Sequence, residues 1–243
     1  MRQILFALGL AAGAFAPAHA QAPDFSKIEV KLTDLGHNIY MMEGGGGNVV
    51  AAAGSDGVIL IDSQAMAMAP KLKAALATKS KAPIKFLVNT HHHGDHVAGD
   101  PFFANEGAIV VGQENERKRL LLPQKNSATG EIDPNPVPAN EIPTLTYASK
   151  MTLRVNGQTA ELSYPGKPAH TDGDLIVHFR HADVIAAGDA FLTTTFPVID
   201  VANGGSTQGF IDGLNRILDL AVPKHLEEGG TYIIPGQIGR AHV

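Results

Sequence analysis

Short apolar runs alternate with glycine-rich or polar turns along most of the chain. Runs of this length, rich in Val and Ile, are typical of buried β-strands, whereas apolar residues at helical spacing indicate helices. Strands are predicted at 28–32, 38–42, 48–53, 58–61, 84–88, 108–111, 144–147, 151–155, 159–163, 175–179, 184–187 and 232–234, and helices at 65–79, 97–104, 113–122 and 207–221. The proline-rich stretch 123–143 separates two strand-rich halves. This order predicts an α/β fold, with two packed sheets between outer helices.

The last predicted helix has Ser206 or Thr207 as its N-cap. It is expected to bury one face, made of Phe210, Leu214, Ile217 and Leu218. The helix predicted at 113–122 is rich in charged residues, which are interpreted as a face exposed to solvent. They are Glu114, Glu116, Arg117, Lys118 and Arg119.

One cluster of polar residues stands out against this pattern. Residues 91–96 read His91-His92-His93-Gly94-Asp95-His96 and follow the predicted strand 84–88 directly, so the cluster lies in a loop at a strand end. Imidazole and carboxylate groups are the ligands that suit zinc and neighbouring divalent metals. A histidine-rich surface loop is the alternative. We favour the metal site, because so many like groups in one turn repel one another unless a cation lies between them.

The amino-terminal segment 1–20 has the features of a secretory signal peptide. It carries one charge, Arg2, an apolar stretch and the small-x-small sequence Ala18-His19-Ala20. We therefore expect a periplasmic or secreted protein in which residues 21–243 form a single domain. No later apolar stretch is long enough for a membrane span.

Composition narrows the chemistry further. The chain has 19 basic and 24 acidic residues, a net charge of −5, and no basic tract, which disfavours nucleic acid as a partner. It has no cysteine, so no disulfide stabilises it and no thiolate can bind a metal or act as a nucleophile. Any metal site must use nitrogen and oxygen ligands.

Further ligands are expected on loops after other strands. His170 lies between two predicted strands, Asp189 ends the strand 184–187, and position 237 follows the last strand. Asp62-Ser63 also ends a strand. The sequence is equally compatible with a capping or turn role for this pair and with a supporting role for the loop at 91–96, which we call the metal loop. The glycines at 44–47 fit a tight hairpin, or a mobile flap over a site.

With these segments the chain resembles the metallo-β-lactamase superfamily from about Gly36 to Gln237. The resemblance implies a four-layer αβ/βα sandwich and a site for two zinc ions. It implies His91, His93 and His170 at the first metal, Asp95 and His96 at the second, and Asp189 between both. His92 occupies a variable position and is expected to face solvent. The family's last ligand is the His of a Pro-Gly-His segment, where this chain has Gln237, so the second site is expected to be weakened.

The resemblance implies a zinc-dependent hydrolase of a small-molecule substrate, which uses a metal-bound hydroxide to cleave an ester, thioester, lactone or lactam. Asp95 is the expected catalytic residue, orienting that hydroxide and carrying a proton to the leaving group. Three alternatives stay open: a β-lactamase proper, an iron-dependent redox relative and a non-catalytic metal-binding protein. The diiron reductases of the family usually have Glu where this chain has His93, which counts against the redox alternative.

The carboxyl-terminal stretch 237–243 can be explained by a sequence that is not part of the gene. Gln-Ile-Gly-Arg-Ala-His-Val can be encoded as CAG ATC GGA AGA GCA CAC GTC, which from the second base matches a common sequencing-library adapter. We therefore expect the natural protein to have His at position 237 and a further helix after it, so that this chain is truncated. The alternative is a genuine short tail, with Gln237 a real departure from the family pattern.

Overall fold

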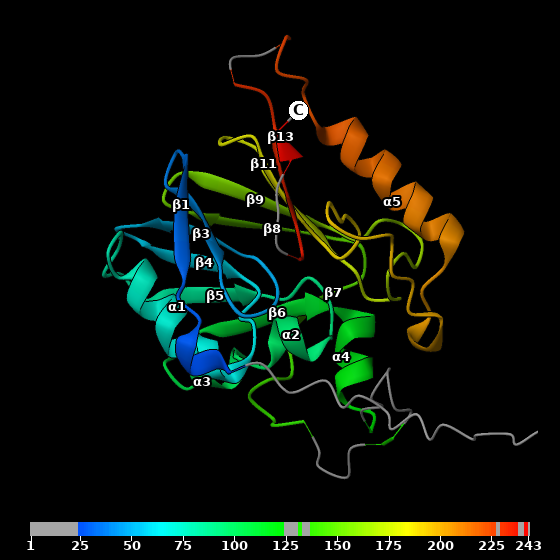
Figure 1. Cartoon of the computed structure of the whole chain (residues 1–243), viewed down its shortest axis with the longest axis horizontal. Coiled ribbons are helices and arrows are strands. Elements are labelled where there is room, and N and C mark those ends of the chain that lie inside the picture. Colours follow the sequence, from blue (N-terminus) through cyan, green and yellow to red (C-terminus); the bar gives the residue numbers. More distant parts are fainter. Residues whose placement is uncertain (1–23, 124–130, 133–136, 227–228, 238–240, 243) are drawn as a thin grey trace, which may run out of the picture.

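The computed structural model describes residues 24–123, 131–132, 137–226, 229–237 and 241–242. Two β-sheets pack face to face, with helices α1 to α4 against one sheet and α5 against the other (Figure 1). The expected four-layer α/β sandwich is therefore confirmed. The predicted signal peptide lies outside the described residues. Among those residues, no helix has both the length and the apolar character that a membrane crossing requires.

Each sheet is built from one continuous half of the chain. The first sheet contains β1 (Lys31–Gly36), β2 (Ile39–Glu43), β3 (Val49–Gly54), β4 (Gly57–Ile61), β5 (Ile84–Val88), β6 (Ile109–Gln113) and β7 (Leu145–Tyr147), in that spatial order. The second contains β8 (Lys150–Val155), β9 (Gln158–Ser163), β10 (Ile176–Phe179), β11 (Val184–Gly188), β12 (Tyr232–Pro235) and β13 (Ala241–His242), also in sequence order.

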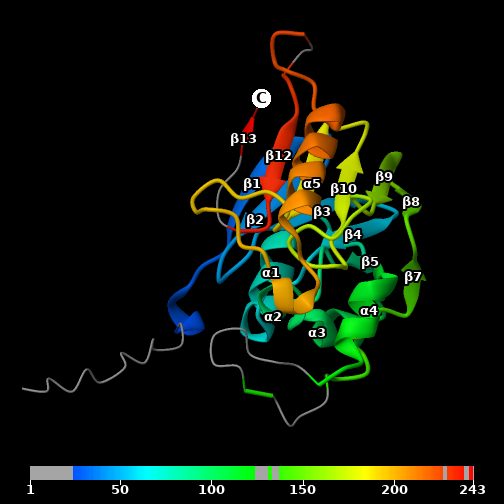
Figure 2. The same ribbon diagram turned by 90° about the vertical axis from the view of Figure 1, so that its right-hand side faces the viewer.

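The helices cover the outer faces of the two sheets (Figure 2). They are α1 (Ala69–Leu76), α2 (Gly94–Val97), α3 (Asp100–Ala104), α4 (Glu114–Leu120) and α5 (Thr207–Leu220). Strands β4 to β7 run parallel to one another, and so do β11 and β12, which α5 connects. The carboxyl ends of neighbouring parallel strands meet at one sheet edge, so the loops that follow them lie side by side.

The largest apolar cluster lies between the sheets. It joins Ile61 and Val88 of the first sheet to Val177 and Ile234 of the second. A second cluster fills the space between the first sheet and α1 and α3, and a third lies under α5. These clusters hold the two sheets in a fixed relation, and therefore hold the loops at their shared edge.

Some expected boundaries were wrong. The apolar residues Ile28 and Val30 pack against the second cluster, but the strand that they suggested begins only at Lys31. The helix expected at 65–79 extends only over Ala69–Leu76, and α3 begins at Asp100 within the segment expected at 97–104. Pro70 and Pro101 each lie in a first turn.

The expected buried face of α5 was also partly wrong. Ser206 caps the helix by accepting a hydrogen bond from the backbone N–H of Gly209. Phe210 and Ile217 are buried, but Leu218 is 66% exposed. Leu218 follows Ile217 by one position, which turns its side chain about 100° away from the sheet.

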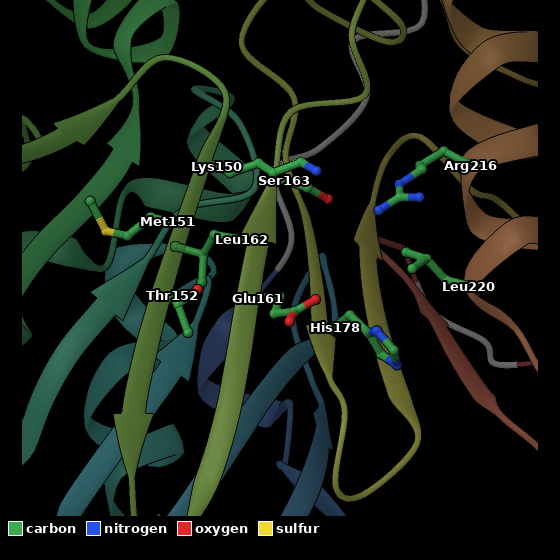
Figure 3. Close-up of a pocket in the computed structure, with 9 residues that line it drawn as sticks. All are labelled: Lys150, Met151, Thr152, Glu161, Leu162, Ser163, His178, Arg216 and Leu220. Atoms are coloured by element: carbon green, nitrogen blue, oxygen red, sulfur yellow. The ribbon is translucent and has the colours of Figure 1, made fainter.

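A pocket on the outer side of the second sheet lies between α5 and strands β8 to β10 (Figure 3). Its polar lining includes Lys150, Glu161, His178 and Arg216. None of the predicted metal ligands lines this pocket. The metal chemistry expected from the sequence must therefore be sought at the sheet edge.

Candidate metal centre

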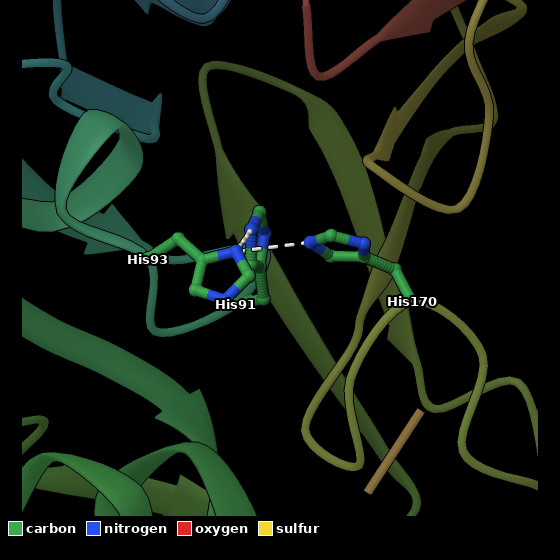
Figure 4. A group of neighbouring side chains, drawn as sticks. All are labelled: His91, His93 and His170. Carbon is green, nitrogen blue, oxygen red and sulfur yellow. Dashed lines mark hydrogen bonds between the residues drawn. The ribbon is translucent and has the colours of Figure 1, made fainter. Parts of the chain in front are cut away.

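Three histidine side chains converge at the edge shared by the two sheets. His91 and His93 lie in the loop after β5, and His170 lies in the loop between β9 and β10. His93 Nδ1 is 3.1 Å from His91 Nε2 and 3.0 Å from His170 Nε2 (Figure 4). We call His91, His93 and His170 the first ligand group; each offers one nitrogen to a common point.

The outward-facing nitrogens of these rings have partners of their own. His93 Nε2 donates to Asp200 Oδ2 at 2.8 Å, and His170 Nδ1 donates to the carbonyl oxygen of Val198 at 2.7 Å. His91 Nδ1 is 3.2 Å from Thr90 Oγ1. A proton held on the outward nitrogen leaves a lone pair on the inward one, which is the state that binds a metal.

The spacing of the inward nitrogens suits a divalent transition metal. Two nitrogens bound tetrahedrally to zinc, at about 2.0 to 2.1 Å each, lie about 3.3 Å apart. The spacings of 3.0 and 3.1 Å to His93 Nδ1 are close to this value. The first ligand group therefore fits such an ion.

The surroundings of two of these rings, His91 and His93, favour the neutral form. Burial, together with the neighbouring imidazoles of His96 and His170, lowers the pKa of His91 well below its ordinary value. Burial and His170 also lower the pKa of His93, although Asp200 opposes that change. Neutral imidazoles are the metal-binding form, so the site keeps its ligands ready at neutral pH.

A second group of ligands, Asp95, His96 and Asp189, lies beside the first. His96 Nε2 is 3.4 Å from Asp189 Oδ1 and 3.5 Å from Asp95 Oδ2. Asp189 Oδ2 is also 3.8 Å from His170 Nε2, so its carboxylate lies between the two groups. Burial alone would raise the pKa of Asp189, but His96 and His170 outweigh burial and lower it to about 2. The six predicted ligand residues are thus brought together in one place.

Asp62 supports the metal loop, which decides between the two roles that the sequence allowed. Its carboxylate accepts from the Thr90 backbone N–H at 2.7 Å, from Thr90 Oγ1 at 2.8 Å and from His96 Nδ1 at 2.8 Å. Burial alone would lower the pKa of His96, but Asp62 and Asp189 raise it well above its ordinary value. The two carboxylates therefore favour positive charge on the His96 ring.

The backbone around these ligands is held by a buried polar network. Ser63 Oγ donates to Asp100 Oδ1 at 2.5 Å, and Asn89 Nδ2 donates to Asp100 at 2.7 Å and to Glu116 at 2.8 Å. The interpretation of Glu116 as part of a solvated face was wrong, since its side chain is fully buried beneath the loop. Burial raises the pKa of both Asp100 and Glu116 well above the ordinary carboxyl value.

The expectation for His92 was also wrong, because only 5% of its surface is exposed. Its ring packs against those of His91 and His93, and burial lowers its pKa to about 3. Asp200 was missed altogether from the sequence. It has no motif around it, and the contact with His93 spans 107 positions in the chain.

The glycines between β2 and β3 form the hairpin tip and lie over the second ligand group. A Cβ atom at Gly46 would lie 3.5 Å from Asp95 Cβ, and one at Gly47 would lie 3.0 Å from His96 Cε1. The small residues therefore let the hairpin approach the site closely. The hairpin that the sequence predicted is confirmed, since β2 and β3 pair in antiparallel fashion on either side of the glycines.

Comparisons with known proteins agree with this arrangement. Metallo-beta-lactamase from Pontibacter korlensis superposes with a TM-score of 0.67 at 16% identity, over 88% of this chain and 94% of that chain. The DIM-1 metallo-beta-lactamase gives a TM-score of 0.65 at 15% identity, over 89% of this chain and 93% of that one. No curated protein matches the sequence.

The structural likeness at these identities shows a common fold. The sequence itself carries the family assignment, because the model of the metallo-beta-lactamase superfamily matches residues 32–227, most of the chain. The resemblance seen in the sequence is thereby confirmed, and the chain belongs to the metallo-beta-lactamase superfamily.

Proposed function

We propose that the protein is an exported zinc-dependent hydrolase that cleaves an ester, thioester, lactone or lactam. The observation that carries this proposal is the convergence of three imidazole nitrogens beside a carboxylate that faces solvent. His93 Nδ1 lies within 3.1 Å of both other nitrogens, and the Asp95 side chain is 48% exposed. Superfamily members are in general metal-dependent hydrolases, which supports the reaction class.

When bound to the first ligand group, zinc supplies Lewis acidity, which lowers the pKa of a water molecule and polarises the bond to be cleaved. The chain's own residues do the rest. Asp95, at the open side of the site, orients the attacking water and passes its proton to the leaving group. The rings of His91, His93 and His170 are held in place, because each has a partner on its outward nitrogen.

The sequence offers no other nucleophile for this chemistry. It contains no cysteine, and no Gly-x-Ser-x-Gly segment is present. Hydrolysis by a side-chain thiolate is therefore excluded. The sequence also lacks the motif of the strained turn that carries the nucleophilic serine in α/β-hydrolases. His93 at the position where the family's diiron reductases usually have Glu favours hydrolysis over redox chemistry.

A β-lactamase proper is the second candidate. The solved structures named above are metallo-beta-lactamases, and the signal-like segment 1–20 would place the enzyme where β-lactams arrive. At 15% and 16% identity these likenesses do not select a substrate. Lactams therefore belong in the same screen as esters, thioesters and lactones.

The decisive experiment measures hydrolysis of these four substrate classes and metal content on one sample. Zinc with turnover of at least one class is the expected result, and His170→Ala protein serves as the inactive control. Bound iron with a visible chromophore would instead indicate the redox alternative. Metal without any turnover would indicate a non-catalytic metal-binding protein.

Export is tested separately. The full chain expressed in a Gram-negative host should be found in the periplasm, shortened at its amino terminus after Ala20. Amino-terminal sequencing of that protein checks the cleavage site. An uncleaved chain confined to the cytoplasm would contradict the proposed export.

A further inference from the structure

We infer that the side-chain amide of Gln237 closes the second ligand group, so that this chain holds one transition-metal ion, at the first ligand group, instead of two. The inference rests on the proposed function, because it concerns the metal content of the same site. It concerns the chain with glutamine at position 237.

The amide nitrogen of Gln237 lies among the three side chains of the second ligand group. Gln237 Nε2 is 3.0 Å from Asp95 Oδ2, 3.2 Å from His96 Nε2 and 3.2 Å from Asp189 Oδ2. It is 3.4 Å from the other Asp189 oxygen. These are the atoms that a cation in the second group would have to contact, so the amide nitrogen stands at the point of their convergence.

The polarity of these contacts matches a hydrogen-bond donor. The carboxylates of Asp95 and Asp189 are acceptors. His96 Nδ1 faces Asp62 at 2.8 Å, so Nε2 is the ring nitrogen that faces Gln237. An amide –NH₂ group has two hydrogens to share among these acceptors and carries no lone pair suited to a metal. The side-chain –NH₂ group of Gln237 therefore donates hydrogen bonds to the groups that would bind an ion. It does not itself bind the ion.

The backbone holds Gln237 in this place. Asn48 Nδ2 donates to the carbonyl oxygens of Pro235 at 2.9 Å and of Gln237 at 2.6 Å. The Gly236 N–H donates to the Gly188 carbonyl oxygen at 2.7 Å. A Cβ atom at Gly236 would lie 2.1 Å from Asp189 Oδ1, so only glycine permits this close approach. The backbone at Gln237 is thus held by Asn48, directly before β3, and by Gly188 at the end of β11.

The first ligand group is unaffected by this contact. In the described part of the chain, the side-chain hydrogen bonds of Gln237 go to Asp95, His96 and Asp189. The nitrogens of His91, His93 and His170 stay directed at one another. One group therefore fits a transition-metal ion and the other does not.

The test is the metal stoichiometry of the intact chain. Purified protein is stripped with a chelator, titrated with zinc, freed of unbound metal and measured by elemental analysis. A parallel cobalt titration follows the visible bands. We expect one ion per chain for the unsubstituted protein. We expect two ions per chain for Gln237→His, which replaces the side-chain amide with an imidazole. Gln208→His is the matched control, since this exposed residue on α5 lies outside the site, and it should bind one ion.

Two zinc ions in the unsubstituted chain would overturn the inference. Binding of a second equivalent of Mn²⁺ would also overturn the inference. In that case the side-chain oxygen of Gln237, and not its nitrogen, would face the second ion. One ion in folded Gln237→His would also overturn it. No bound metal in any variant would instead overturn the proposed function, so the two failures are distinguishable. If Gln237→His does not fold, the stoichiometry of the unsubstituted chain still decides.

Discussion

Replacing Asp200 by Asn should weaken zinc binding, although Asp200 touches no metal. Its carboxylate accepts the Nε2 proton of His93 at 2.8 Å and is only 9% exposed, so the bond is little weakened by water. Asn203 Nδ2 donates to the same oxygen at 2.6 Å and holds the carboxylate in place. Loss of such a partner typically reduces metal affinity by about 10- to 100-fold, or about 1.4 to 2.8 kcal/mol.

The two ends of that range belong to different substitutions. In Asp200→Asn the amide oxygen can still accept from His93, but without charge, and charged hydrogen bonds are about twice as strong as neutral ones. We therefore expect about tenfold weaker binding for Asp200→Asn and up to about 100-fold for Asp200→Ala, which leaves His93 without an acceptor.

A competition titration against a chromophoric chelator measures these affinities. Asp212→Asn is the control, since it makes the same change at a carboxylate on α5 that pairs with the surface groups Lys167 and Gln208. Circular dichroism of the metal-free proteins checks that the fold is intact. Equal zinc affinity in folded Asp200→Ala and in the control would refute the role of Asp200.

Three further substitutions test the site and its support. His170→Ala removes a nitrogen of the first ligand group, so activity should be abolished and bound metal should fall in elemental analysis; an unchanged metal content would contradict the assignment. Asp95→Asn should lower kcat by about 10²- to 10⁴-fold with the first-group metal retained, and an unaltered kcat would reject its proton-transfer role. Glu116 has a pKa raised by burial, so the folded state keeps a proton that the unfolded state loses, and stability falls as the pH rises above about 4.5. In urea unfolding of metal-free protein, Glu116→Gln should therefore gain stability relative to the parent between about pH 5 and pH 8; a pH-independent difference would argue against the buried proton.

The sequence predicted those parts of the site that are local or carried by a motif. His91, His93, Asp95 and His96 lie within one turn, so their proximity follows from the chain itself. His170 and Asp189 were predicted from their places after strands together with the family resemblance. Their actual proximity depends on the packing of the two sheets, which only the structure shows.

Contacts without a sequence signal were missed or misread. Asp200 has no periodic pattern around it and reaches His93 by folding of a long loop. Glu116 belongs to a run of charges that usually marks a solvated helix face, but Asn89 provides a buried partner and turns that position inward. His92 is buried, and two of the charged groups that influence its pKa, Arg119 of α4 and Asp200, are distant from it in sequence.

The division of the chain into two continuous sheets has a consequence for folding. The first sheet ends at Tyr147 before the second begins at Lys150, so each can form from neighbouring segments, as local contacts favour. His91 and His93 come from the first half and His170 from the second. Neither half alone can therefore complete the first ligand group, and tight metal binding reports that the halves have docked. At a free zinc concentration about 1,000 times its Kd, the ion would stabilise the docked chain by about 4.1 kcal/mol. Metal supply during synthesis would then control how long the apolar faces between the sheets are exposed to aggregation.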